Sequence, residues 1–234
     1  MTAWIRHIQF ALLMLGISSA LSASEEAGNS EAVSTATRPN VVVIMVDDAG
    51  LMDFEPFGGE ASMPNIQRLA DQGVRFTNYR TSPLCAPSRA MLLTGIDNHL
   101  TGIATIPEVL PSEHESAPGY SMVLEPGVKT MGDHLRAGGY RTYMTGKWHM
   151  GSRPQDLPVS HGFDRSFILD ASGADNWEQR PYIPYYDTAP WFEDDKPANL
   201  PEDFYSSKFI VDKMIDYVGQ GKADAETRAQ PFLA

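Results

Sequence analysis

The sequence of 234 residues has one cysteine, few basic side chains and no long apolar run. A single cysteine excludes a framework of disulfide bonds within the chain. Lys and Arg number 18 against 30 Asp and Glu, which gives a net charge of -12. We therefore expect no nucleic-acid partner, because contacts to phosphates need clustered cations. No segment approaches the roughly twenty apolar residues of a membrane-spanning helix, so no stable membrane span is predicted.

The composition is that of a globular protein. Hydrophobic residues make up 42% of the chain and charged residues 21%, and no internal repeat is visible. These proportions exclude a disordered, collagenous or coiled-coil protein. The length is enough for one large domain or two small ones with a sizeable core.

Residues 1–22 have the pattern of a secretory signal peptide. Arg6 and His7 precede the apolar stretch 8–17, which small residues follow, as at a cleavage site. This predicts a secreted or periplasmic protein; a membrane anchor or a buried helix is the alternative. Residues 23–38 are polar and predict a flexible linker, so the folded part is expected to span 39–234.

Strand and helix patterns alternate in the folded part. The β-branched run 40–46 predicts a strand buried on both faces of a parallel sheet. Apolar periodicity and terminal signals, such as Thr130 three residues before Asp133, predict several helices. The predicted helices cover 64–71, a segment that starts near Cys85, 130–137 and 206–218, and the further predicted strands cover 74–79 and 140–145. This alternation indicates an α/β fold with a mostly parallel sheet flanked by helices.

Residues 152–205 differ from the rest. They contain seven prolines and many aromatic residues without a clear period. We interpret them as a long ordered excursion over the sheet, which either contributes to a substrate cleft or only covers the core.

Three groups of reactive side chains fall where an open α/β sheet places its active site, beyond the carboxyl ends of strands. The first is Asp47-Asp48. Two adjacent carboxylates after a buried strand need a cation or hydrogen bonds, and oxygen ligands suit Ca²⁺ or Mg²⁺. The backbone must turn here for both to reach one ion. An ordinary solvated turn is the alternative.

The second group is Cys85 with Arg89. Cys85 is placed at the start of a helix, where free N–H groups favour anions, and Arg89 follows one turn later on the same face. A nucleophile beside a guanidinium suggests attack on a tetrahedral oxyanion. A buried structural cysteine is an equally good interpretation of these residues alone.

The third group is Lys147 with His149, which strand alternation puts on one side, with Trp148 on the other. A cation and an imidazole together can hold an oxyanion and handle the proton of a leaving group.

These motifs together resemble the type I sulfatases. Residues 85–89 (C-A-P-S-R) and 93–95 (L-T-G) match the first signature of that family, and residues 139–149 match the second. Three further segments occur in family order: 46–50 (V-D-D-A-G), 63–66 (M-P-N-I) and 73–78 (G-V-R-F-T-N). The resemblance extends over residues 39–234.

The resemblance implies an alkaline-phosphatase-like fold and a sulfate-ester hydrolase of the arylsulfatase type. In such enzymes a maturation enzyme oxidises the signature cysteine, here Cys85, to Cα-formylglycine. The hydrated aldehyde supplies the nucleophilic oxygen, and its second hydroxyl later expels sulfate. Arg89 would hold the formylglycine, Lys147 the sulfate and His149 the hydrated aldehyde.

The resemblance also implies a divalent cation, Ca²⁺ or alternatively Mg²⁺. Its ligands would include Asp47, Asp48 and the converted Cys85. It would neutralise charge and orient the sulfate.

The sequence departs from the family pattern at its end. Residues 230–234 resemble the start of the strand before the next catalytic histidine, and neither that histidine nor the later Asp-Asn pair and lysine follow. We therefore expect a truncated catalytic domain with little or no activity as a 234-residue chain. The alternatives are a phosphonate or phosphate-ester hydrolase of the same superfamily, or a non-catalytic remnant.

Overall fold

The structure, a computed structural model, describes residues 38–234. The predicted signal peptide (1–22) and nearly all of the predicted linker (23–38) lie outside the described residues. No helix in the described range has the length and apolar character needed to cross a membrane.

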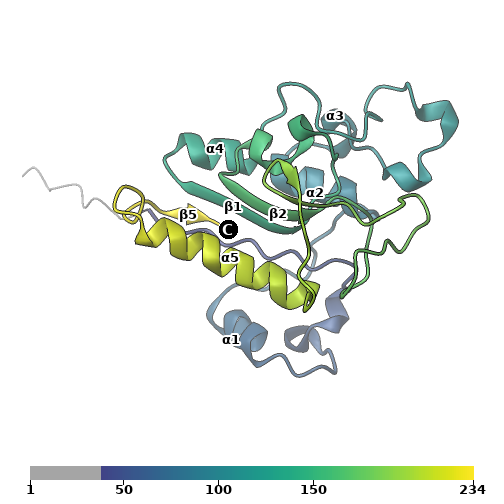
Figure 1. The fold of residues 1–234 in the computed structure, drawn as a ribbon. Helices are drawn as coiled ribbons and strands as arrows, with labels where there is room; N and C mark the ends of the chain where they lie inside the picture. The colour runs from purple at the N-terminus through teal and green to yellow at the C-terminus, as the bar shows by residue number, and fades with distance from the viewer. Residues whose placement is uncertain (1–37) are drawn as a thin grey trace, which may run out of the picture. The chain divides into compact units, whose positions relative to one another are not determined.

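The described residues build an α/β fold around a five-stranded sheet of order β4-β3-β2-β1-β5 (Figure 1). The strands are β1 (Arg141–Lys147), β2 (Arg165–Leu169), β3 (Trp191–Glu193), β4 (Lys196–Pro197) and β5 (Phe232–Leu233). Strand β1 runs parallel to both β2 and β5, and Thr145 of β1 is in register with Phe167 of β2. Strands β3 and β4 extend the sheet antiparallel at one edge. The predicted fold class is confirmed.

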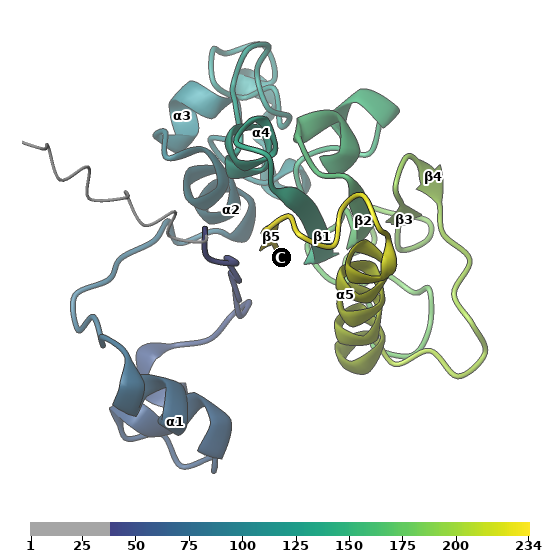
Figure 2. The ribbon, with the colours of Figure 1, turned by 90° about the vertical axis from the view of Figure 1, so that its left-hand side faces the viewer.

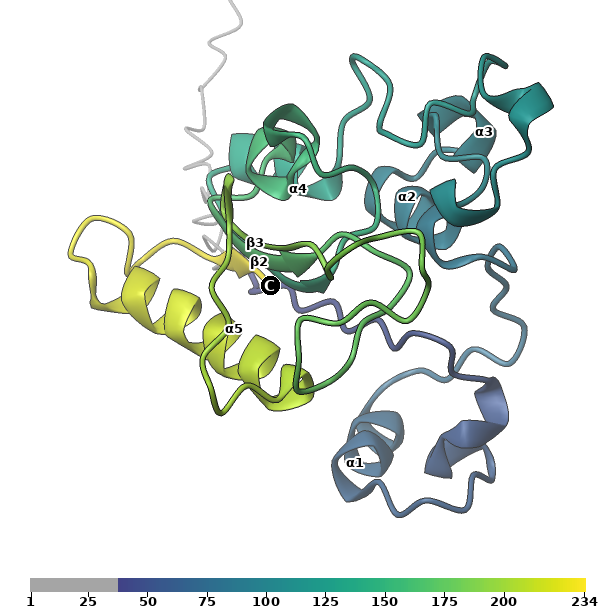
Figure 3. The ribbon, with the colours of Figure 1, turned by 45° about the vertical axis from the view of Figure 1, so that its right-hand side comes forward.

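Helices cover both faces of the sheet. Helix α2 (Cys85–Thr94) and helix α4 (Met131–Ala137) lie on one side of β1, and helix α5 (Ser206–Ala223) lies on the other (Figures 2 and 3). Alternate strand residues enter two cores: Met144 and Ile168 pack toward α2 and α4, whereas Tyr143 and Phe167 pack toward α5. The other helices are α1 (Pro64–Gln72), α3 (Asn98–Thr101) and the short 3-10 helices η1 (Leu51–Asp53), η2 (Glu55–Phe57), η3 (Pro107–Val109), η4 (Ser112–His114), η5 (Pro154–Asp156) and η6 (Pro158–His161).

The predicted helices are confirmed, and their local signals explain them. Helix α4 begins with the expected reciprocal cap, in which the Asp133 N–H donates to Thr130 Oγ1 (3.2 Å) and the Thr130 N–H donates to Asp133 Oδ2 (3.0 Å). Helix α5 buries its Tyr217 against the sheet and continues five residues beyond the predicted end at 218.

Two predicted strands are wrong. In 40–46, Val41 and Val43 donate N–H groups to the carbonyls of Phe232 and Ala234 (2.8 Å each), but no strand continues beyond them and Ile44 is 73% exposed. In 74–79 there is no strand, and residues 71–80 are all exposed. A strand needs a neighbour to satisfy its backbone, and among the described residues neither segment has more than the short β5 beside it.

The interpretation of 152–205 as a long ordered excursion over the sheet is also wrong in part. This range contains β2, which pairs with β1 over five residues, and the antiparallel edge strands β3 and β4. Four of the five residues of β2 are buried, so the strand lacks the alternation that marks a half-exposed one.

Candidate active site

The chain turns sharply where β1 ends, and this turn positions Lys147 and His149. Trp148 is fully buried between them and donates its indole N–H to the Asp156 carbonyl (2.9 Å). His149 has a left-handed backbone (φ 61), an uncommon conformation for a residue with a side chain. The buried carboxylate of Asp170 stabilises the turn by accepting the next two backbone N–H groups, of Met150 (2.8 Å) and Gly151 (3.0 Å).

Cys85 is the first residue of α2 and faces this turn. Its Sγ lies 3.3 Å from His149 Nδ1. The preceding residue, Leu84, gives the helix no side-chain cap, so N–H groups at this end are free to meet an anion. Burial would raise the pKa of the Cys85 thiol, but the hydrogen bond to His149 and the charge of Lys147 outweigh it and lower the pKa to about 7.

Asp47 joins the two cationic side chains of the site. Lys147 Nζ donates to Asp47 Oδ2 (2.6 Å), and Arg89 Nη2 donates to Asp47 Oδ1 (2.9 Å). Arg89 also donates to the Lys147 carbonyl (2.8 Å), which ties α2 to the end of β1. Burial opposes ionisation of Asp47, but the two cations prevail and lower its pKa.

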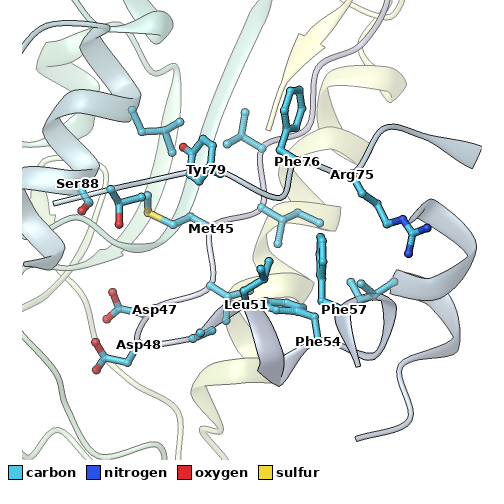
Figure 4. Close-up of a pocket in the computed structure, with 18 of the residues that line it drawn as sticks. Met45, Asp47, Asp48, Leu51, Phe54, Phe57, Arg75, Phe76, Tyr79 and Ser88 are labelled. Atoms are coloured by element: carbon cyan, nitrogen blue, oxygen red, sulfur yellow. The ribbon is translucent and has the colours of Figure 1, made fainter. Parts of the chain in front are cut away.

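Asp48 is exposed and has a left-handed backbone (φ 54). This is the turn that the adjacent carboxylates were expected to require. As Figure 4 shows, the carboxylates of Asp47 and Asp48 lie on the same side of the chain. The structure thus brings together the predicted site residues Cys85, Arg89, Lys147, His149 and Asp47, with Asp48 at the rim.

The described residues do not complete a metal site by themselves. Within 38–234, no group of three His, Cys, Asp or Glu side chains could hold a metal ion. A hard cation takes six to eight oxygen ligands, and both oxygens of Asp47 already accept hydrogen bonds from cationic side chains.

The site opens into a large hollow. Its volume is about 810 Å³, and it extends from Asp47, Asp48 and Cys85 to the apolar side chains of residues 43–57 and 66–92. Figure 4 shows Phe54, Phe57 and Phe76 on the side of the hollow away from the carboxylates.

Glu108, which none of the sequence motifs includes, lies behind His149. The two oxygens of Glu108 are 3.0 and 3.1 Å from His149 Nε2. No motif spacing connects positions 108 and 149. A lone carboxylate in the apolar context I-P-E-V-L (106–110) was the only available signal, since a buried charge needs a partner.

Comparison with known proteins defines the class to which this site belongs. The family model described as Sulfatase matches residues 39–234. An arylsulfatase of Klebsiella aerogenes is 35% identical over 207 residues, which cover 84% of this chain and 41% of the relative. An uncharacterized sulfatase of Schizosaccharomyces pombe is 36% identical over 208 residues, covering 84% and 38%.

Solved structures agree in fold. The structure of Ps i-CgsB in complex with k-i-k-neocarrahexaose has a TM-score of 0.67 and 26% identity, over 83% of this chain and 43% of that one. A second, bound to its substrate D-glucosamine-2-N,6-O-disulfate, has a TM-score of 0.61 and 28% identity, over 84% and 33%. The chain belongs to the sulfatase family and spans about two fifths of the length of the two curated relatives named above.

Proposed function

We propose that the protein hydrolyses sulfate esters, with Cys85 converted to Cα-formylglycine as the source of the nucleophile. The observation that carries this proposal is the convergence of Cys85, His149, Lys147 and Arg89 at the carboxyl end of β1 in a chain of the sulfatase family. The position fits the modification, because residue 85 is half-buried, begins a helix and faces an imidazole. When formed, the hydrated aldehyde supplies a nucleophilic oxygen that a thiol lacks.

The surrounding side chains have separate tasks in this proposal. Lys147 is 11% exposed and binds an anionic sulfate oxygen by charge. Arg89 is 9% exposed and holds the Lys147 carbonyl and Asp47 in place, and it contributes positive charge where the reaction develops negative charge. His149 holds and moves a proton at the side chain of residue 85, which its Nδ1 faces.

Asp47 and Asp48 would supply two carboxylates to a Ca²⁺ or Mg²⁺ ion, together with the converted residue 85. Their position on one side of the chain supports this proposal, because carboxylate oxygens are the ligands that Ca²⁺ and Mg²⁺ prefer. Such an ion takes six or more oxygen ligands, so these side chains would leave positions for further oxygen ligands.

The substrates we propose are sulfate esters of carbohydrates or aryl alcohols. One solved relative is bound to a sulfated glucosamine and a curated relative is an arylsulfatase. A formylglycine-generating maturation enzyme is the second partner. Residues 1–22 support export to the periplasm or the exterior, because their charged start and short apolar core are those of a signal peptide.

The test is turnover of matched aryl sulfate and aryl phosphate esters by a protein that contains this chain, coexpressed with the maturation enzyme. We expect sulfate to be preferred, Cys85→Ala to lower kcat by at least about 10³-fold, and His149→Ala to lower it by about 10²-fold or more. His99→Ala is the matched control, because His99 is 60% exposed. A preference for phosphate, or an unmodified thiol at Cys85 by mass spectrometry of protein from its native host, would contradict the proposal.

A further inference from the structure

Glu108 is an enclosed charged side chain beside the candidate site. Its side chain is 0% exposed and that of His149 is 1% exposed. Glu108 Oε1 accepts from the Ser172 backbone N–H (3.0 Å) and from the Tyr186 hydroxyl (2.9 Å). These two donors lie in the segment after β2. They fix the position of Glu108 independently of its contact with His149.

The chemistry of a carboxylate decides the state of the imidazole. Burial would raise the pKa of Glu108, but the hydrogen bond to His149 and the charge of His149 outweigh burial and lower the pKa to about 2. Glu108 is therefore ionised, and an ionised carboxylate only accepts hydrogen bonds. Nε2 of His149, which lies 3.0 Å from Oε1, must therefore carry a proton. In the neutral ring the other nitrogen, Nδ1, is then the unprotonated one, and it faces Cys85 at 3.3 Å.

Ser172 also connects the two functional side chains. Its N–H donates to Glu108 and its carbonyl accepts from Lys147 Nζ (2.5 Å). One peptide segment therefore sets the position of the imidazole through Glu108 and that of the ammonium directly. If Glu108 only stabilised the η3 segment, it would not need to contact His149. It contacts Nε2 of His149, and the other ring nitrogen, Nδ1, faces residue 85.

We propose that Glu108 is a positioning residue that fixes His149 with its proton on Nε2 and its Nδ1 free toward residue 85. The inference rests on the proposed function, in which residue 85 supplies the nucleophile. In that reaction, His149 with this orientation accepts a proton at Nδ1 from the side chain of residue 85 and returns it there, while Nε2–H stays bonded to Glu108.

The test reads the tautomer directly and needs no turnover. The full chain with Cys85→Ser, in which no thiolate faces Nδ1, is labelled with ¹⁵N in its histidines and recorded by NMR in alkaline solution where the ring is neutral. The His149 signals are assigned by their loss in His149→Asn. We expect a single Nε2–H tautomer in the Cys85→Ser chain and a mixture of tautomers when Glu108→Gln is added to it, because an amide can donate as well as accept. Two controls, Glu113→Gln at an exposed carboxylate and Tyr186→Phe, which leaves the carboxylate in place, should keep Nε2–H.

An Nδ1–H tautomer in the Cys85→Ser chain would overturn the inference even if Glu108→Gln does not fold, and so would an unchanged Nε2–H tautomer in a folded Glu108→Gln. In the mature protein, Glu108→Gln should lower kcat about 10-fold to 100-fold with KM within about 2-fold. Loss of sulfatase turnover in every form, with the tautomer behaving as expected, would refute the proposed function and leave the positioning role of Glu108 intact.

Discussion

The two sides of the candidate site are built in opposite ways. On the side formed by α2, η3 and the carboxyl end of β1, the side chains of Glu108 and Arg89 are buried and each makes several hydrogen bonds. On the other side, residues 42–83, which we call the open segment, include no buried residue. The open segment contributes Asp47 and Asp48 and lines much of the hollow.

The difference shows which part of the site the described chain determines by itself. A functional group is held in place by the side chains and backbone packed around it, and these exist for His149, Lys147 and Arg89. The open segment instead presents Ile44, Val74 and Phe76 to solvent, with exposed fractions of 69–80%. Clustered exposed apolar side chains of this kind mark a packing surface. Matched substitutions on the two sides should therefore differ in their effect on stability.

The largest difference should come from removing the same side chain on each side. Ile168 in β2 is 0% exposed and Ile44 in the open segment is 73% exposed. We expect Ile168→Ala to lower the free energy of unfolding by about 4 kcal/mol, since it removes buried methyl groups and leaves a cavity. Ile44→Ala should change it by less than about 0.5 kcal/mol. Urea denaturation followed by tryptophan fluorescence measures both, and equal losses would show that the open segment is packed in solution.

Arginine substitutions give the second comparison. Arg89 donates to a backbone carbonyl and to Asp47 inside the site, whereas Arg75 donates to the Pro56 carbonyl (2.8 Å) at an exposed position. Replacing Arg89 with Met leaves the Lys147 carbonyl and one oxygen of Asp47 without a donor, and should cost about 2 kcal/mol of unfolding free energy.

Arg75→Met is the matched control and should stay within about 0.5 kcal/mol. The same urea titration measures both variants. If Arg75→Met lowered the unfolding free energy as much as Arg89→Met, the open segment would be as well packed as the opposite side of the site, which would contradict the comparison.

Most elements that the sequence predicted have local signals, and the strand predicted over 140–145, which forms β1, is the exception. The cap at Thr130, the helix start at Cys85 and the apolar stripe of α5 each depend on residues within one helix, and each helix forms. Strands depend on a partner elsewhere in the chain. For this reason 40–46 and 74–79 have strand composition without a sheet around them, and β2 is a central strand that its sequence did not reveal.

The candidate site divides in the same way. Cys85, Arg89, Lys147 and His149 lie in two short motifs with fixed internal spacing, so their convergence could be predicted. Strand alternation gave the right side for Lys147 and His149, although the backbone turns at His149 (φ 61). Glu108 belongs to neither motif, and only the fold brings it to His149.

Acid stability should separate a buried carboxyl from an exposed one. The pKa of Glu108 falls from an ordinary 4.5 to about 2 on folding, so below pH 4.5 the unfolded chain binds a proton that the native chain does not. The stabilisation is complete above pH 4.5 and decreases as the pH falls toward 2, with a loss of about 2 kcal/mol by pH 3.

Glu108→Gln should therefore flatten the dependence of unfolding free energy on pH between 4.5 and 3. Glu60→Gln, at an exposed carboxyl in the open segment, should leave it as in the unaltered chain. Urea titrations at several pH values measure the slope, and an identical slope in Glu108→Gln would show that Glu108 does not make its buried hydrogen bonds in solution.

The smallest difference concerns hydroxyl groups. Thr130 is fully buried, caps α4 through Oγ1 and donates to the His161 carbonyl (2.7 Å), whereas Thr81 is exposed and donates to the adjacent Ser82 carbonyl (3.2 Å). Thr130→Ala should cost about 1 kcal/mol, because the first turn of α4 loses its acceptor, and amide hydrogen exchange should accelerate in α4 specifically. Thr81→Ala should change neither quantity measurably.

Because α1 has no side-chain cap and no buried residue, its amides should already exchange faster than those of α4 in the unaltered chain. If the amides of α1 were protected as strongly as those of α4, the exposed residues of α1 would have to be covered in solution. The open segment would then be packed as closely as the opposite side of the site.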